Sequence, residues 1–192
     1  MQVLNVGGNN KAIALPPQYE GYEHRLLDID PAVNPDVLCD ARRLTTLQAE
    51  RFEAVYCSHN LEHYHHHEVN GVLGGFLHVL KSRGFAHILV PDLQQVMRIT
   101  LERGLDLEDV LYQSAAGPIT VLDVLYGYGV EIERSGHDYF AHKTGFTQTS
   151  LLKALQRAGF AKIYCWTRPL EIQALAFKGS PDPEVLSRFN LS

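Results

Sequence analysis

The sequence predicts a doubly wound α/β fold built on a mostly parallel sheet of seven strands. Short apolar runs recur along the chain and are apolar on both faces, as buried parallel strands are. Helical patterns lie between these runs, and such alternation places helices on both faces of one sheet. The first run breaks at a pair of glycines, which is typical of ligand-binding turns in this fold class.

The seven expected strands are bounded by turn residues and cover residues 2–6, 24–29, 37–39, 54–58, 86–90, 162–167 and 172–177. The chain has 192 residues with 45% hydrophobic content, which is enough to bury one core. Because no internal repeat indicates a second core, we expect a single domain over residues 1–192.

The turn after the first expected strand is suited to a nucleoside. Gly7 and Gly8 lack side chains, so the backbone there can approach a ligand closely. A dinucleotide fingerprint needs three glycines at set positions, and Asn9, Asn10 and Lys11 stand where the later ones would fall. The turn therefore favours a nucleoside over a pyrophosphate-bridged dinucleotide.

Acidic residues lie at or just beyond the ends of the second and third expected strands. Asp28 and Asp30 lie where a carboxylate can reach ribose hydroxyls, and we expect one of the two only to cap a turn. Asp40 and Ala41 follow the third strand. Asp40 is either a ligand contact or the N-cap of a helix that begins near Arg42.

The fourth expected strand leads into SHNLEH, residues 58–63, at the edge of the sheet where open α/β folds bind ligands. Helical spacing would put His59 and His63 on one face, and imidazole titrates near neutral pH, so both are candidate general bases. The alternatives are that His59 lines the pocket and that Glu62 or His63 anchors the helix.

Two helical patterns are clear. The first runs from about 61 to 81 and ends before Gly84. The second has Thr147 or Thr149 as its N-cap and ends at Gly159. The apolar stripes of these helices consist of Val69, Val72, Leu73, Phe76 and Leu80 in the first, and Leu151, Leu152, Leu155 and Ala158 in the second.

Residues from about 104 to 143 are longer than an ordinary connection, and we expect a lid-like insertion there. Tyr126, Tyr128, His137 and His142 are its candidate residues for an acceptor pocket, although each is also suited to the core of a lid. Residues 179–192 are polar and contain prolines, which predicts a surface extension or a swap into a partner.

Charge and hydropathy exclude several classes of partner. A net charge of -5 argues against binding to duplex nucleic acid or to an anionic membrane surface. No apolar run approaches the roughly 20 residues of a membrane span, and no signal peptide precedes the first strand, so we expect a cytoplasmic protein. The sequence leaves a homodimer open.

The sequence predicts neither a metal site nor a disulfide. The histidine run 65–67, with His59 and His63, invites a metal site, but consecutive helical residues point about 100° apart and H-E-x-x-H is absent. Cys39, Cys57 and Cys165 lie in apolar strand-like segments without C-x-x-C, as reduced core cysteines do.

Five ordered segments resemble class I S-adenosylmethionine-dependent methyltransferases, close to the small bacterial type 11 group. They are LNVGG at 4–8, LDIDP at 27–31, PDVLCDA at 35–41, FEAVYCSHNLEH at 52–63, and FLHVLKSRGF at 76–85 with VPD at 90–92. The resemblance covers most of the chain. It implies S-adenosylmethionine as the cofactor and S-adenosylhomocysteine as the product.

The resemblance also implies a role for each segment. The glycine turn would pass under the methionine part of the cofactor, Asp28 would bind the ribose hydroxyls, and Asp40 with the next amide would bind adenine. The usual acid and final glycine of the turn are replaced by asparagines. The cofactor-binding residues implied in this way are Asn5, Gly7, Gly8, Asn9, Asp28, Asp40, Ala41 and Ser58.

We therefore expect a methyltransferase that acts on oxygen or nitrogen of a small-molecule, saccharide or lipid-linked acceptor. The fold alone does not decide the activity. One alternative is a non-catalytic nucleoside-binding or scaffold protein of the same fold, which Asn5 and Asn9 favour. A less favoured alternative is an NAD-binding oxidoreductase, because the glycine pattern is broken.

Overall fold

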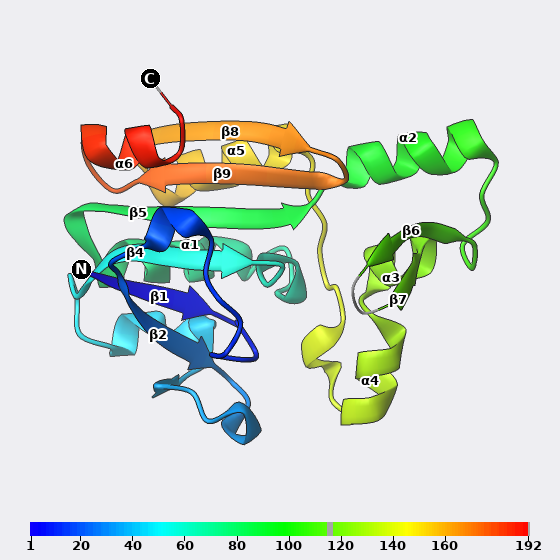
Figure 1. The fold of residues 1–192 in the computed structure, drawn as a ribbon, viewed down its shortest axis with the longest axis horizontal. Coiled ribbons are helices and arrows are strands. Elements are labelled where there is room, and N and C mark those ends of the chain that lie inside the picture. Colours follow the sequence, from blue (N-terminus) through cyan, green and yellow to red (C-terminus); the bar gives the residue numbers. More distant parts are fainter. Residues whose placement is uncertain (115–116, 192) are drawn as a thin grey trace.

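A seven-stranded sheet forms the centre of the computed structural model, which describes residues 1–114 and 117–191 (Figure 1). Positions 115 and 116 of the expected insertion and 192 of the expected tail lie outside these ranges. The strands of the sheet are β1 (Gln2–Val6), β2 (Glu23–Asp28), β3 (Val37–Leu38), β4 (Phe52–Ser58), β5 (Leu80–Pro91), β8 (Lys162–Arg168) and β9 (Glu171–Phe177).

The strand order is β3-β2-β1-β4-β5-β9-β8. Strand β9 runs antiparallel to β5 and β8, and the other pairings of this sheet are parallel. The predicted fold class is confirmed. The chain order reverses direction across the sheet at β1 and β4, and ligands of open α/β folds bind beyond the carboxyl ends of strands at such a point.

One face of the sheet is covered by α1 (Val69–Val79), α5 (Gln148–Ala158) and the short helix η3 (Ala41–Thr46). The side chain of Thr147 caps α5 by accepting from the Ser150 amide, and Gly159 ends the helix with φ +103°. Of the two expected N-caps, Thr147 is therefore confirmed. The buried stripe of α1 contains Val69, Val72, Leu73 and Phe76, as predicted.

The predicted helix from 61 to 81 is wrong at both ends. Residues 61–63 form a separate short helix, η4 (Leu61–His63), and His65–His67 lie in an exposed turn before α1. The imidazole of His63 is held by the carbonyl oxygens of His59 and Ala141, which fixes this turn apart from α1. At the other end, Leu80 pairs with Phe52 in the sheet, so the chain leaves the helix four residues before Gly84.

The opposite face of the sheet is covered by η1 (Pro17–Tyr19) and α6 (Pro183–Arg188). The prediction of a surface extension for residues 179–192 is wrong, because Val185 is buried and Leu186, Phe189 and Leu191 pack against the same cluster. Apolar side chains spaced along this short helix outweigh its polar composition. Arg188 also donates to the carbonyl oxygens of Gln18 and Glu20.

The expected insertion forms a small subassembly beyond the carboxyl ends of β1 and β4 (Figure 1). It follows α2 (Leu93–Arg103) and contains β6 (Val110–Ser114), β7 (Gly117–Thr120), α3 (Val121–Tyr126), α4 (Gly129–Ser135) and η5 (Asp138–Phe140). Its buried residues, with one from α2, are Val96, Leu111, Ile119, Val121 and Val124. The three cysteines are free. Among the helices of the described ranges, none is long and apolar enough to cross a membrane.

Candidate functional site

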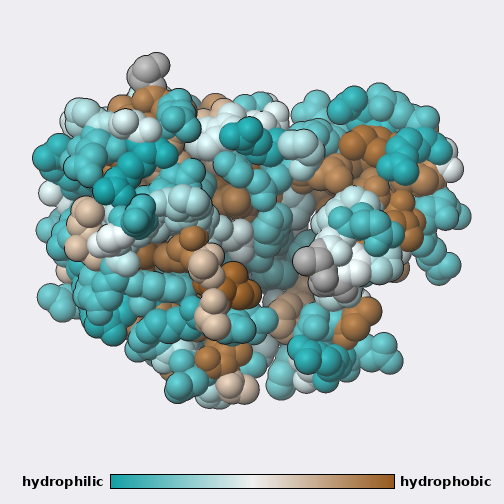
Figure 2. Space-filling view, in the orientation of Figure 1, coloured by the Kyte–Doolittle hydropathy of each residue, from teal (hydrophilic) through white to brown (hydrophobic). Residues whose placement is uncertain are grey.

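A cavity of about 490 Å³ lies between the carboxyl ends of β1, β2 and β4 and the insertion. Its volume is within the usual range for small-molecule sites. Figure 2 shows the surface hollowed between the sheet and the insertion. The residues that line this cavity include Gly7, Asn9, Asp28, Asp30, Asp40 and Arg42 from the sheet side, and Asp138, Tyr139, Phe140 and Lys143 from the insertion.

The glycine turn after β1 packs closely against asparagine side chains. Gly7 has φ +69°, and a Cβ atom there would clash with the amide of Asn60. A Cβ atom at Gly8 would clash with the amide of Asn5. Asn9 has φ +56°, so an asparagine adopts the left-handed conformation at the position where the resemblance leads us to expect glycine.

Four of the eight predicted cofactor residues, Gly7, Asn9, Asp28 and Asp40, line this cavity. Asn5 is buried under the turn, where its Nδ2 lies 3.1 Å from Nε2 of His24. Gly8, Ala41 and Ser58 are also absent from the lining found among the described residues. Ala41 is instead a buried residue of η3, and Ser58 ends β4.

Asp28 and Asp30 have different surroundings. The buried Asp28 carboxylate accepts from the amide of Asn9 at 3.2 Å and from the amide of Asp30 at 3.0 Å, one bond on each oxygen. Each oxygen has a second lone pair, so both can still accept from a ligand. Asp30 caps the short helix η2 (Pro31–Val33) by accepting from the Ala32 amide at 2.8 Å.

Asp40 is the N-cap of η3 and accepts from the Arg42 amide at 2.9 Å. Its carboxylate also pairs with the guanidinium of Arg42, which reaches Glu68 at 2.8 Å on its other side. Burial alone would raise the pKa of Asp40, but the hydrogen bonds from Arg42 hold that pKa below its ordinary value. The N-cap alternative is therefore present in the structure, and an adenine contact by Asp40 stays a prediction.

A second cavity of about 220 Å³ adjoins the first, and His59, His63 and Phe140 line both. Of the four predicted acceptor residues, Tyr128 and His142 line it. Tyr126 is 62% exposed, and His137 stacks on Tyr139 at the surface with ring centroids 4.8 Å apart. Lining residues that the sequence analysis missed are Tyr112, Ile119, Asp123, Val124 and Leu170. Only Asp123 has a readable sequence signal, the capping box that it forms with Thr120 at the start of α3.

His59 stands between the two cavities and is paired with two carboxylates. Its Nε2 lies 3.0 Å from Oε2 of Glu171, and its Nδ1 lies 3.5 Å from Oε1 of Glu62. Burial alone would lower the pKa of His59, but these carboxylates raise it to about 10. The protonated imidazole has no lone pair for a general base. The predicted helical face shared with His63 is wrong, because His59 lies before η4 with φ +48°.

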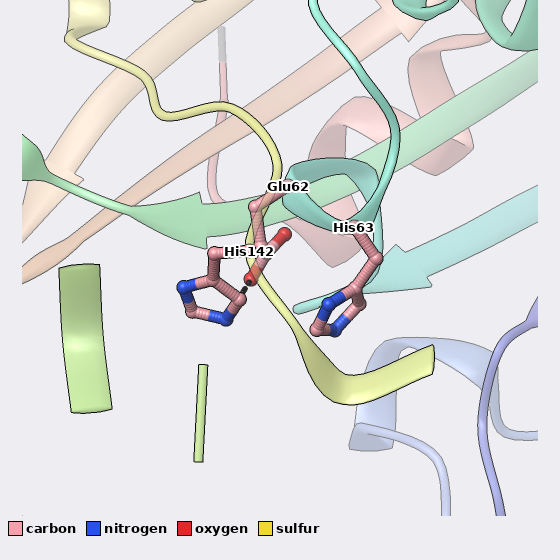
Figure 3. A group of neighbouring side chains, drawn as sticks. All are labelled: Glu62, His63 and His142. Carbon is pink, nitrogen blue, oxygen red and sulfur yellow. Dashed lines mark ion pairs between the residues drawn. The ribbon is translucent and has the colours of Figure 1, made fainter. Parts of the chain in front are cut away.

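Glu62, His63 and His142 converge beside His59 (Figure 3). Glu62 is 1% exposed; burial favours a high pKa for its carboxyl group, but the neighbouring His59 holds that pKa below its ordinary value. Burial lowers the pKa of His142. Two segments about 80 residues apart in sequence thus bring one carboxylate and two imidazoles together.

Comparison with known proteins identifies the class of this fold. No family model matches the sequence, and no curated protein matches it. Solved structures do match. A SAM-dependent methyltransferase from Archaeoglobus fulgidus aligns with 14% identity and a TM-score of 0.58, over 92% of this chain and 85% of that one.

Two Burkholderia thailandensis proteins are also similar. The 1,6-didemethyltoxoflavin-N1-methyltransferase, solved with 1,6-didemethyltoxoflavin and S-adenosylhomocysteine, has 18% identity and a TM-score of 0.54, over 93% of this chain and 71% of that one. An O-methyltransferase family protein has 12% identity and a TM-score of 0.52, over 94% of this chain and 52% of that one. The chain has the class I methyltransferase fold, which is what the resemblance in its sequence predicted.

Proposed function

We propose that this chain is an S-adenosylmethionine-dependent methyltransferase that acts on oxygen or nitrogen of a small-molecule, saccharide or lipid-linked acceptor. The observation that carries the proposal is the pair of adjoining cavities at the carboxyl edge of the sheet. One is polar and has the acids expected for a nucleoside, and the other has aromatic walls. A donor and an acceptor bound side by side need two such spaces.

The residues of the first cavity fit the cofactor. Gly7 and Asn9 form a left-handed turn, and the backbone at Gly7 can approach a ligand closely because glycine has no side chain. The free lone pairs of Asp28 suit a pair of ribose hydroxyls. Asp40 and Arg42 would border the base. S-adenosylmethionine held there would supply a methyl group, with its sulfur keeping the electron pair of the broken carbon–sulfur bond and the proton of the acceptor passing to water.

The second cavity supports a small acceptor with a flat apolar part and one polar group. Tyr112, Tyr128 and Phe140 offer aromatic contacts, and Asp123 and His142 offer polar ones. The residues of this chain would hold the acceptor in line with the methyl group and keep water away, which is the main task in methyl transfer.

Calorimetric titration with S-adenosylmethionine, S-adenosylhomocysteine and NADH tests the proposal. We expect micromolar binding of the first two and none of NADH. Binding of NADH alone would favour the oxidoreductase, and binding of none of the three would contradict the proposal.

A second candidate is a non-catalytic nucleoside-binding protein of the same fold. The pairing of His59 with Glu62 and Glu171 favours it, because the protonated imidazole has no lone pair with which to take a proton from an acceptor. Tight cofactor binding without turnover over a wide panel of hydroxyl and amine acceptors would favour this candidate over the enzyme.

A further inference from the structure

We propose that Glu62, His63 and His142 bind a divalent transition-metal ion at the junction of the two cavities. Their ligand atoms lie within 4.8 Å of one another. Both histidines line the second cavity, and His63 lines the first as well. Figure 3 shows the three side chains converging, with a dashed line that joins Glu62 and His142. The histidine run 65–67 takes no part.

The tautomer of His142 supports an ion at this place. Its Nδ1 lies 2.8 Å from the carbonyl oxygen of Val124, which can only accept, so Nδ1 carries the hydrogen. The neutral ring then presents the lone pair of Nε2 toward Oε1 of Glu62, 4.0 Å away. A metal ion between these two atoms would be bound by both, at a place where the side chain of Glu62 is 1% exposed and that of His142 13%.

Glu62 provides a second indication of an ion. It is 1% exposed, and within the part of the chain that the structure describes neither of its carboxylate oxygens accepts a hydrogen bond. The nearest cationic atom is Nδ1 of His59 at 3.5 Å, and His59 is shared with Glu171. A buried carboxylate without hydrogen bonds is costly, and an ion would satisfy it.

His63 provides a third indication, because its two ring nitrogens both lie 3.1 Å from backbone carbonyl oxygens, those of Ala141 and His59. In its neutral form the imidazole can donate to only one of them, which leaves the lone pair of the other nitrogen for an ion. That nitrogen would gain by turning to an ion. The other would keep its bond to a carbonyl, as metal-bound histidines do.

Backbone hydrogen bonds hold the two ligand segments together. The carbonyl oxygen of Glu62 accepts from the amides of Lys143 at 2.8 Å and Thr144 at 3.1 Å, and the amide of His142 donates to Tyr126. Tetrahedral ligands at about 2.1 Å from an ion lie about 3.4 Å apart. The ligand atoms, now within 4.8 Å of one another, would therefore have to approach by up to about 1.4 Å to close around an ion.

Two imidazoles and one carboxylate suit Zn²⁺ and related ions better than Mg²⁺ or Ca²⁺, which prefer oxygen ligands. Three protein ligands leave a position open toward the second cavity. If the proposed methyl transfer holds, that position would take an acceptor oxygen. Binding of the ion itself does not depend on that function.

Zn²⁺ titration of chelator-treated protein, without cofactor or acceptor, tests the site. We expect about one tightly bound ion per chain, and Co²⁺ in its place should give the visible absorption of a low-symmetry site. His142→Gln and His63→Gln should each weaken Zn²⁺ binding by at least about tenfold. Glu62→Gln should do the same where circular dichroism shows that it folds.

The matched control replaces the exposed histidines, with His65→Gln and His67→Gln together, because their stacked rings can also attract Zn²⁺. This variant should keep the tight site. The proposal is overturned if wild type binds no Zn²⁺, or if the control loses binding while His142→Gln keeps it. Zn²⁺ binding without S-adenosylmethionine binding would contradict only the proposed function.

Discussion

The carboxylate of Asp28 is the best-placed ligand group of the first cavity, because it is buried at the end of β2 and has a free lone pair on each oxygen. We predict that Asp28→Ala weakens S-adenosylmethionine binding by more than about tenfold, since unpaired buried hydroxyls cost on the order of 1–3 kcal/mol. Calorimetry measures the change.

Asp30→Ala is the matched control, because Asp30 lines the same cavity but uses its carboxylate to cap η2. The affinity of this variant for S-adenosylmethionine should stay close to that of wild type. If instead Asp30→Ala lost affinity and Asp28→Ala kept it, the ribose contact would belong to Asp30.

His87 of β5 should make the fold sensitive to acid. It is 4% exposed, its Nδ1 lies 3.2 Å from the hydroxyl of Tyr19, and burial lowers its pKa from 6.5 to about 4. Between these values the unfolded chain binds the proton and the folded chain does not. The free energy of unfolding should therefore fall as pH drops from about 6.5 toward 4, by about 2–3 kcal/mol from this group.

Urea unfolding at pH 7 and pH 4.5 measures this loss. His87→Gln should lose less stability between the two pH values than wild type, because its side chain does not titrate. His67→Gln, at an exposed histidine, should behave as wild type does. Equal acid sensitivity in wild type and His87→Gln would show that carboxyl groups alone cause it.

Helix α5 was predictable almost to the residue because its signals are local. An N-cap, an apolar stripe and a C-terminal glycine all lie within the segment itself. The helix expected over 61–81 was not, because its ends depend on partners far along the chain. Ala141 holds His63 in a separate turn, and Phe52 pairs with Leu80. Local patterns cannot show such contacts.

The N-cap of α5 can be tested by comparing variants of Thr147 and of the nearby Thr149. Thr147→Ala should lower the free energy of unfolding by about 1 kcal/mol, because the amide of Ser150 loses its acceptor. Thr149→Ala lies two residues on, at an exposed helical position, and should change stability by less than about 0.5 kcal/mol. Urea midpoints compare the two, and equal midpoints would argue against the cap.

At the scale of the whole molecule, the sequence predicted the sheet and the lining of the first cavity better than the lining of the second. Gly7 follows β1, Asp28 ends β2 and Asp40 lies two residues beyond β3, so the fold class alone brings them to one edge. Tyr112 and Leu170 reach the second cavity through the packing of the insertion and of the β8–β9 turn. The local sequence around these two residues does not predict that packing.

The C-terminal segment is the clearest case in which packing overrides composition. The composition of residues 179–191 predicts a polar tail. The ring centroid of Phe189 nevertheless lies 4.9 Å from that of His87 and 5.8 Å from that of Phe85. Together with Tyr19 and Val185, Phe189 covers the face of the sheet that α1 and α5 leave open. The segment should therefore stabilise the whole sheet.

We predict that Phe189→Ala lowers the free energy of unfolding by about 2 kcal/mol, below the cost of truncating a fully buried ring because Phe189 is only half-buried. In urea the midpoint should fall while the slope stays the same, since the folded state remains compact. Leu101→Ala, at a side chain that is 82% exposed, is the control and should leave the midpoint unchanged. If Phe189→Ala unfolded at the wild-type midpoint, the segment would contribute no stability and would behave in solution as the surface extension that its composition predicts.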